Sequence, residues 1–270
     1  MLKLKVFHQW FLIILSGIVL AISLRVFVFA VFTIPTPSMR PTIEGGDRVV
    51  VNKLIPGPRI ISNFFSLKDG EEPNYVRLLG WRKIKHNDVL IFNYPYSKKH
   101  LTIDRSVFYA KRCVATPGDT FYIENGRYKV KGISDTLGHY PAQKKLSEMP
   151  VEKIKKGVYR CFPKKSQYNW NVKDFGSIYI PAKGDTLAIN TKNQALYKNL
   201  ITYETNKNIT VSDSLVLLGD SIINKYVFHK NYYFMAGDYV FDSKDSRYWG
   251  LLPEDHIVGK VSCIYKSDNP

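Results

Sequence analysis

The sequence predicts a mainly β protein, in which an N-terminal transmembrane helix precedes an antiparallel β core that carries an inserted, more variable, β-rich domain. One long apolar run stands near the N-terminus, and after it short runs of Val, Ile, Tyr and Phe alternate with turn residues, as is typical of strands. Helical periodicity is weak in this remainder. The 270 residues are 45% hydrophobic and 23% charged, which is enough apolar surface to bury a core and excludes a wholly disordered chain.

The predicted transmembrane helix follows two lysines, Lys3 and Lys5. The uncharged run at residues 10–24 has 15 residues and as a helix is about 22 Å long, less than the roughly 30 Å of a hydrocarbon core. The sequence is apolar again beyond Arg25, so we expect residues 10–34 to span the bilayer, with Arg25 reaching the head groups or facing protein. A cleaved secretory signal peptide is the alternative, and the length of the apolar stretch disfavours it.

Charge predicts where the two ends of the chain lie. The lysines at the extreme N-terminus favour a single-pass protein with a cytoplasmic N-terminus and an extracytoplasmic core. Arg25 and Arg40, beyond the apolar run, oppose this orientation. The formal net charge of +16 suits a domain beside anionic lipid head groups. Because the Lys and Arg are scattered and form no recognition-helix pattern, a nucleic-acid partner is disfavoured.

Strands are predicted through the rest of the chain from runs of β-branched and aromatic residues. In chain order they cover residues 48–52, 88–93, 106–115, 120–124, 127–130, 176–180, 215–218, 232–236 and 256–265. Asn125-Gly126 between two of these runs predicts a type I′ hairpin, since both central residues of that turn need a positive φ. Pro117-Gly118-Asp119 predicts a second turn.

The regular strands fall into two groups separated by less regular sequence. We expect residues 1–33 to form the cytoplasmic tip and the anchor, 34–130 the first part of the core, and 226–270 its second part. Residues 131–225 are rich in Lys and less regular, and we expect them to form the inserted domain. Residues 54–85 are rich in Pro, Gly and charge, which predicts a surface insertion within the core.

Several kinds of site are excluded by what the sequence lacks. Three cysteines without C-x-x-C or C-x-x-H spacing exclude a disulfide scaffold and a Cys-based zinc site. The six histidines are scattered, and no G-x-S-x-G, H-E-x-x-H, P-loop or dinucleotide fingerprint occurs. We therefore expect no metal and no cofactor, which leaves Ser, Thr, Lys and carboxylates to carry any reaction.

Three segments concentrate residues that can carry chemistry. Residues 34–42 hold Ser38 among prolines that fix the backbone directly after the anchor, although a rigid linker is the plainer interpretation. In a strand over residues 109–119, Lys111 could be desolvated by its neighbours, although strand lysines usually reach water. Residues 235–250 are dense in Gly, Asp and Ser and suggest an ordered loop; a structural turn and a Ca²⁺ loop are the alternatives, and the usual Ca²⁺-ligand order is absent.

In this order the three segments resemble bacterial type I signal peptidases, a family of Ser/Lys-dyad endopeptidases. The first reads P-x-x-S-M-x-P-T beside an anchor, the second K-R-x-x-x-x-P-G-D, and the third G-D-(x₄)-S-x-D-S-R-x-x-G. One such motif alone is weak evidence, but the three together are specific. The resemblance covers the anchor and residues 33–53, 86–95, 104–126 and 232–262, and leaves the intervening segments uncovered.

The resemblance implies roles for the residues of the first two segments. Ser38 matches the nucleophile and Lys111 the general base. Thr36 stands where the family often has a Ser whose hydroxyl, with the N–H of the nucleophile, forms the oxyanion hole. Cys113, two residues after Lys111 in the same strand, is expected to be a free, buried thiol.

The third segment supplies supporting residues by the same resemblance. Ser243 matches the residue that hydrogen-bonds and orients the lysine, and Asp245 and Arg247 match the pair behind it. Asp238 ends the Gly-Asp pair that opens this segment. Asp242 stands before the serine where the family commonly has Asn, which puts the local hydrogen bonding in doubt.

The resemblance implies a membrane-bound serine endopeptidase, a hydrolase that removes N-terminal signal peptides from secreted preproteins after small residues at −3 and −1. Its partners would be secretory preproteins and the lipid bilayer, with no nucleic acid and no metal. Lys111 would act as the neutral amine, so its pKa must fall from a reference value of about 10.4. Two alternatives remain: a related Ser/Lys protease with one dedicated substrate, and a non-catalytic, membrane-tethered β protein that binds peptides or anions.

Overall fold

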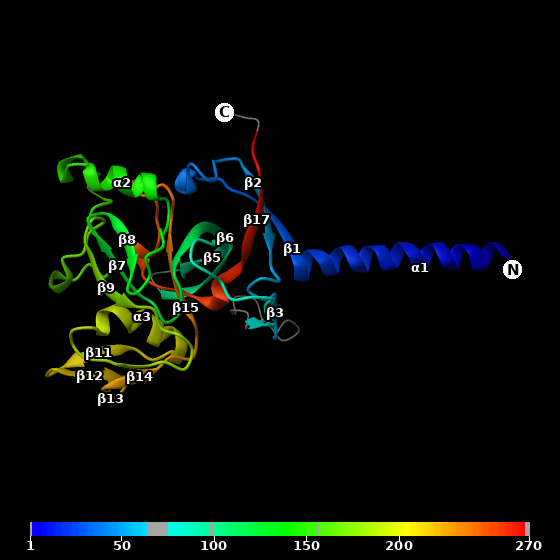
Figure 1. Cartoon of the computed structure of the whole chain (residues 1–270). Coiled ribbons are helices and arrows are strands. Elements are labelled where there is room, and N and C mark those ends of the chain that lie inside the picture. Colours follow the sequence, from blue (N-terminus) through cyan, green and yellow to red (C-terminus); the bar gives the residue numbers. More distant parts are fainter. Residues whose placement is uncertain (1, 64–74, 98–99, 156, 268–270) are drawn as a thin grey trace.

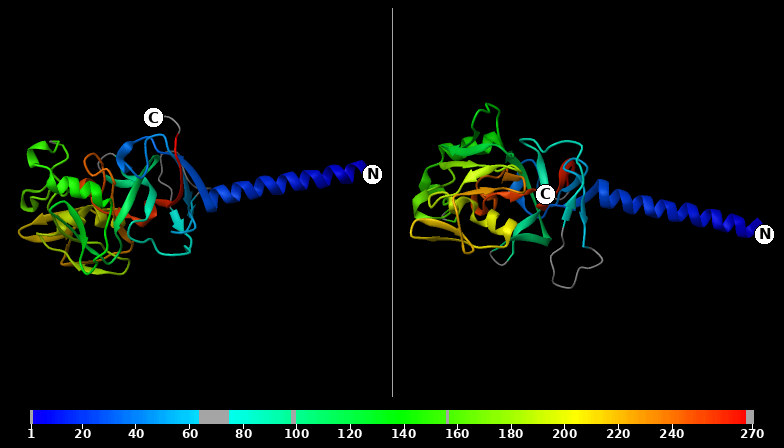
Figure 2. Two further views of the ribbon diagram at one scale, coloured as in Figure 1. Left: turned by 45° about the horizontal axis from the view of Figure 1, so that its top comes forward. Right: turned by 90° about the horizontal axis from the view of Figure 1, so that it is seen from below.

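A long N-terminal helix projects away from a β-rich body in the computed structural model, which describes residues 2–63, 75–97, 100–155 and 157–267 (Figure 1 and Figure 2). Helix α1 (Leu2–Ser23) continues through a π-helical turn over Leu24–Val28. The segment Phe7–Val28 is long and apolar enough to cross a membrane, and the described body buries none of its most apolar stretch. An apolar surface without a protein partner is what a lipid-facing helix presents.

The anchor helix ends earlier than the predicted span of residues 10–34. Residues Phe29–Thr33 form strand β1, which pairs antiparallel with β2 (Arg48–Asn52). Val, Phe and Thr favour extended backbone, and this pairing supplies hydrogen-bond partners to a segment that has left the helix. Lys53, directly after β2, donates its backbone N–H to Val28 O at 2.8 Å and its ammonium group to carbonyls of the preceding turn. The end of the helix is therefore tied to the core sheet.

Strand β2 belongs to a seven-stranded sheet in the order β1-β2-β17-β5-β6-β15-β16, in which all neighbours are antiparallel. The other strands of this sheet are β5 (Val89–Ser97), β6 (His100–Ala115), β15 (Tyr232–Ala236), β16 (Leu252–Pro253) and β17 (Ile257–Tyr265). Strand β17, near the end of the chain, lies between β2 and β5, so distant parts of the sequence complete one sheet. The predicted antiparallel, mainly β core is thus confirmed.

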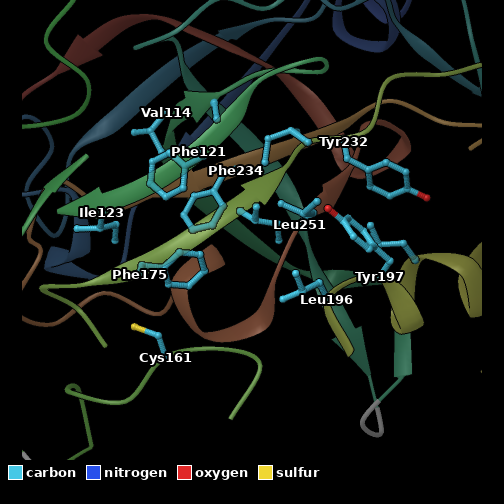
Figure 3. Packing of buried hydrophobic residues seen from close by; sticks show 14 of the residues in the cluster. Val114, Phe121, Ile123, Cys161, Phe175, Leu196, Tyr197, Tyr232, Phe234 and Leu251 are labelled. Atoms are coloured by element: carbon cyan, nitrogen blue, oxygen red, sulfur yellow. The ribbon is translucent and has the colours of Figure 1, made fainter. Parts of the chain in front are cut away.

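A smaller sheet packs aromatic side chains against the central one. Its strands are, in order, β8 (Arg127–Val130), β7 (Thr120–Glu124) and β9 (Phe175–Tyr179). Figure 3 shows Phe121 of β7 and Phe175 of β9 beside Phe234 of β15, and the rings of Phe121 and Phe234 stack with centroids 4.1 Å apart. Asn125 and Gly126 join β7 to β8 with φ of 46° and 73°, so the predicted hairpin is confirmed.

The region between β8 and β15 contains helices that the sequence did not predict. Besides β9, its elements are α2 (Tyr140–Glu148), β10 (Thr186–Ala188), α3 (Gln194–Thr205), β11 (Ile209–Ser212), β12 (Leu215–Leu218), β13 (Ser221–Ile223) and β14 (Lys225–Val227). Helix α3 buries only Leu196, Tyr197, Leu200 and Ile201. An apolar face of that length is too short for periodicity to distinguish it from a strand.

Every strand predicted from the sequence is present. Strand β5 continues past residue 93 and strand β6 begins before residue 106, because the two strands form one long hairpin. The predicted surface insertion at residues 54–85 contains the short hairpin β3 (Arg59–Ile61) and β4 (Tyr75–Arg77), and its residues 64–74 lie outside the described residues. Short 3₁₀ turns cover Pro37–Met39, Val151–Lys153, Ser166–Tyr168 and Glu254–His256.

Candidate active site

Ser38 lies in the 3₁₀ turn Pro37–Met39, a few residues after β1. Pro37 suits the first position of the turn because its φ is fixed and it has no N–H to leave unpaired. Met39 is fully buried in the apolar cluster beneath β2, which anchors the turn. The carbonyl of Ser38 accepts a hydrogen bond from Tyr239 N–H at 3.1 Å. The buried Met39 side chain and the hydrogen bond from Tyr239 therefore fix the backbone of Ser38.

Strand β6 brings Lys111 to Ser38. Nζ of Lys111 is hydrogen-bonded to Oγ of Ser38, although the two residues are 73 positions apart. Thr36 Oγ1 lies 3.4 Å from the same Ser38 oxygen. The side chains are shielded from water, since Lys111 is 3% and Ser38 9% exposed. The structure thus places three of the residues singled out in the sequence in one cluster.

The environment of Lys111 favours its neutral amine. Burial lowers the pKa of Lys111 to about 8; the carboxylates of Asp245 and Asp238 act in the opposite direction, and the charge of Arg247 adds to the lowering. The Tyr109 ring centroid lies 5.3 Å from Nζ and forms part of the wall. An amine with this pKa is partly deprotonated near neutral pH and can accept a proton from a hydroxyl.

A cavity of about 440 Å³ adjoins this cluster. Its walls are residues 34–38, residues 107–111 of β6, Asp242 and Lys244. A larger polar cavity of about 790 Å³ lies between α3 and the tip of the β5–β6 hairpin, but neither Ser38 nor Lys111 lines it. The nucleophile and base candidates therefore face the smaller cavity.

A buried ion pair organises residues 237–250, which we call the aspartate loop. Asp245 and Arg247 are both fully buried, and Arg247 Nε and Nη2 each donate to Asp245 at 2.8 Å. Burial alone would raise the pKa of Asp245, but the Arg247 charge and the hydrogen bonds hold it below its usual value. Asp245 also accepts the N–H of Gly237 at 2.9 Å and caps helix α4 (Ser246–Trp249). The pair therefore fixes both ends of the loop.

Ser243 lies against Gly237 in the middle of this loop. A side chain on Gly237 would collide with Ser243 and approach the Ser38 carbonyl oxygen to 2.6 Å, so only glycine fits there. Ser243 Oγ is buried and has no hydrogen-bond partner among the described residues. The expected hydrogen bond from Ser243 to Lys111 is accordingly not formed in this structure.

A second polar cluster joins all three motif segments, and the sequence did not reveal it. Arg112 donates Nε to Asp238 Oδ1 at 2.7 Å and Nη1 to Asn87 O at 2.9 Å. Thr42 donates its hydroxyl to Asp238 Oδ2. Arg112 and Thr42 belong to the motifs, but nothing in their spacing indicates that both meet Asp238. Because Arg112 follows Lys111 in β6, this cluster fixes the strand that carries the lysine.

The cysteines take no part in the cluster. Cys113, Cys161 and Cys263 are all free, and Cys113 is fully buried, which confirms the expected buried thiol. Burial raises the pKa of Cys113 well above its usual value, so this thiol is a poor nucleophile. Among the described residues, no group of three or more His, Cys, Asp or Glu could hold a metal ion.

Comparison with known proteins identifies the family. Residues 7–266 match the family described as "Signal peptidase, peptidase S26". Signal peptidase I of Aquifex aeolicus is 29% identical over 262 residues, which cover 96% of this chain and 82% of that protein. Signal peptidase I of Buchnera aphidicola subsp. Schizaphis graminum is 27% identical over 245 residues, which cover 90% of this chain and 70% of that protein.

A solved signal peptidase I from Enterococcus faecalis shares 16% identity over 67% of this chain and 97% of that chain, with a TM-score of 0.33, a likeness too weak to inform the fold. The family match, by contrast, extends over nearly the whole chain and includes all three motif segments. This protein therefore belongs to the signal peptidase family, peptidase S26, and is a serine endopeptidase.

Proposed function

We propose that this chain removes N-terminal signal peptides from secretory preproteins, with Ser38 as nucleophile and Lys111 as general base. The observation that carries the proposal is the hydrogen bond between Lys111 Nζ and Ser38 Oγ, in a buried cluster that faces a cavity of about 440 Å³. A serine hydroxyl attacks a peptide carbonyl only when a base takes its proton. Lys111, with its pKa lowered to about 8, is the basic side chain hydrogen-bonded to Ser38 Oγ.

The mechanism follows from these two groups. The neutral Lys111 amine accepts the proton of the Ser38 hydroxyl as Oγ bonds to the scissile carbonyl carbon. The N–H of Ser38 and the hydroxyl of Thr36 stabilise the resulting oxyanion, each contributing on the order of 3 kcal/mol. The Lys111 ammonium then protonates the leaving amine, and the C–N bond breaks. Water, deprotonated by the same amine, hydrolyses the acyl-enzyme and restores Ser38.

The supporting residues act through these two groups. We propose that the Asp245–Arg247 pair tunes Lys111, because the pair is fully buried and its charges bear directly on the lysine pKa. Asp238 positions the lysine strand through Arg112. Neither the attack by Ser38 nor the hydrolysis of the acyl-enzyme requires a metal or a cofactor. Lys111 supplies the base, and a backbone N–H and a hydroxyl group supply the oxyanion donors.

We propose that the cavity receives small side chains at −1 and −3 of the substrate. Alternate residues of an extended peptide point to the same side, so the −1 and −3 side chains enter the cavity together. Ile34, Pro35, Phe108 and Tyr109 give the cavity a largely apolar lining. We therefore expect apolar side chains at both positions, and the resemblance to the family implies that they are small, as alanine is.

We propose that the anchor holds this cavity at the membrane surface. Residues Phe7–Val28 can cross a bilayer, and β1 follows immediately, with Ser38 ten residues beyond Val28. We propose a cytoplasmic N-terminus and a catalytic core on the extracytoplasmic face of the plasma membrane, because lysines precede the anchor. A signal peptide that spans the same bilayer would present its cleavage site at this level.

The test is cleavage of several unrelated preproteins by the full chain in detergent, with the products identified by mass spectrometry. We expect a cut directly after Ala-x-Ala, and at least a hundredfold loss of rate when Leu or Phe replaces the −1 alanine. Cleavage of one preprotein alone would point instead to a dedicated protease. Unspecific cleavage, or none, would contradict the proposed function.

A further inference from the structure

A second cavity adjoins the catalytic one. It has a volume of about 250 Å³ and lies between residues 145–158 of the inserted region and residues 239–242 of the aspartate loop. Asp242 lines both cavities, so they meet at this side chain. Met149 and Phe241 are among the apolar residues that line the second cavity. A peptide in the catalytic cavity can therefore continue past Asp242 into the second one.

Lysines dominate the rim of the second cavity. Lys145, Lys153 and Lys155 line it and are exposed, and Asp242 is the one carboxylate among its described lining residues. Lys155 Nζ lies 3.3 Å from Asp242 Oδ2, but both side chains are largely exposed, so this pair is weak and leaves an excess of positive charge. Lys244 adds a further positive charge at the adjoining end of the catalytic cavity.

Hydrogen bonds hold this part of the inserted region against the aspartate loop. Tyr248 donates its hydroxyl to Val158 O at 2.8 Å, and Phe162 donates its N–H to Arg247 O at 2.7 Å. Arg247 is in turn fixed by its buried ion pair with Asp245. The lysine-bearing wall is therefore held in place relative to the catalytic cavity.

The lining of the catalytic cavity comes from different parts of the chain, which suggests the direction of a bound peptide. Ile34 lines it and follows β1 and the anchor directly. Asp242 and Lys244 of the aspartate loop also line it, and Asp242 is shared with the second cavity. Helix α2, which carries Lys145, is on the side of the body away from α1 (Figure 1 and Figure 2). Because the apolar part of a signal peptide comes from the membrane, residues after the scissile bond point toward the lysines.

We propose that the second cavity is a subsite for the first residues of the mature protein, and that it favours Asp and Glu there. The inference rests on the proposed function, since a preprotein is what places a peptide across both cavities. Lysines around a half-enclosed groove attract carboxylates and repel basic side chains. The subsite thus adds a charge preference to the side-chain size preference of the catalytic cavity.

The test uses the full chain in detergent and one preprotein with an Ala-x-Ala site, made with acidic, neutral or basic residues at mature positions +2 to +4. We expect kcat/KM to decrease in that order, with about a fivefold difference between the acidic and basic versions at low salt. The difference should shrink at high salt, because salt screens exposed charges.

A charge-reversal variant locates the preference. In K145E/K153E/K155E the ratio of kcat/KM for the acidic and basic substrates should fall to one or below. The matched control K131E/K192E/K225E changes net charge equally at exposed lysines that line neither cavity, and should keep the wild-type ratio. Because each ratio is measured within one protein, a lower yield of folded enzyme does not affect it.

Equal kcat/KM for the three substrates with the wild-type chain would overturn the subsite, and so would an unchanged ratio in the lysine variant. If the control variant lost the preference as well, the effect would come from net charge and the subsite would again be overturned. Cleavage of none of the substrates, the neutral one included, would instead overturn the proposed function and the subsite with it.

Discussion

In the proposed mechanism, the protonation state of Lys111 determines whether Ser38 can react. Burial brings the lysine pKa to about 8, against the pull of Asp245 and Asp238, so near pH 7 only about a tenth of the molecules hold the neutral amine. The charge of Arg247 acts with burial and helps to keep the amine neutral. Activity should therefore be limited by lysine protonation at and below neutral pH.

The first prediction concerns this pH dependence. Only the deprotonated lysine accepts the serine proton, so kcat/KM for a preprotein should rise with pH, about tenfold per unit below pH 7, and level off above a midpoint near 8. Initial rates between pH 5.5 and 10.5 measure this profile. A midpoint near 10.5, the usual value for lysine, or a rate that falls as pH rises would contradict the assigned base.

The second prediction concerns the replacement of Gly237. In Gly237→Ala the new Cβ would collide with Ser243 and press on the Ser38 carbonyl, which moves the nucleophile. We expect kcat/KM to fall about a hundredfold, since displacements of this kind near a nucleophile have that effect. The matched control is Gly157→Ala, where a Cβ meets nothing within 4 Å, and it should retain wild-type kcat/KM. Equal activity of the two variants would show that Gly237 has no such role.

At the scale of elements, the aspartate loop depends on its buried ion pair. Asp245 and Arg247 are fully buried and bond to each other, to the Gly237 N–H and to the Val240 carbonyl. Such a pair adds little net stability when intact, but the loss of one partner leaves the other as an unpaired buried charge. The loop should therefore tolerate the loss of either partner poorly.

The variant Arg247→Met tests this dependence. It keeps the side-chain volume but strands the Asp245 carboxylate, and should reduce the free energy of unfolding by about 3–5 kcal/mol. The exposed pair Lys129–Glu124 supplies the control, because Lys129→Met should leave the free energy of unfolding almost unchanged. Denaturant unfolding of both variants provides the comparison. Losses of similar size would mean that the buried pair does not organise the loop.

Strand β1 connects the anchor to the core, and two deletions can separate its role from that of the helix. Removal of residues 1–28 leaves β1 paired with β2, whereas removal of residues 1–33 exposes the edge of β2. We expect the chain without residues 1–28 to remain folded and to cleave a soluble preprotein, and the chain without residues 1–33 to melt at a lower temperature and aggregate. Identical melting temperatures would show that β1 is only a linker.

At the scale of the whole molecule, local signals predicted the strands and turns but not the contacts between them. The hairpin at Asn125-Gly126 could be predicted because the turn itself requires residues that adopt a positive φ. Helix α3 was not predicted because its apolar face is short. Phe29–Thr33 was predicted to lie in the membrane span because it continues an apolar run, but it pairs as a strand. Packing of its buried face decided α3, and pairing with β2 decided Phe29–Thr33. Local sequence signals do not show either contact.

At the candidate site, too, individual residues could be predicted but the contacts between them could not. Ser38 and Lys111 were found because their motifs resemble a known family, while the distance of 73 residues between them gives no geometric clue. The contacts of Arg112 with Asp238 and Asn87 depend on how β6 meets β15 and the turn before β5. The domain boundaries at residues 33, 130 and 225 stay predictions, although β17 shows that the two ends of the chain build one sheet.

The most direct test of the account compares one Ala-x-Ala preprotein with the wild-type chain, Ser38→Ala, Lys111→Met and Lys111→Arg. We predict that all three variants fold and lose at least about a thousandfold in kcat/KM; Lys111→Arg keeps the charge but its guanidinium cannot serve as a base. Cleavage by Lys111→Met within tenfold of wild type would contradict the assignment of Lys111 as base. Retained activity in Ser38→Ala would contradict the assignment of Ser38 as the nucleophile.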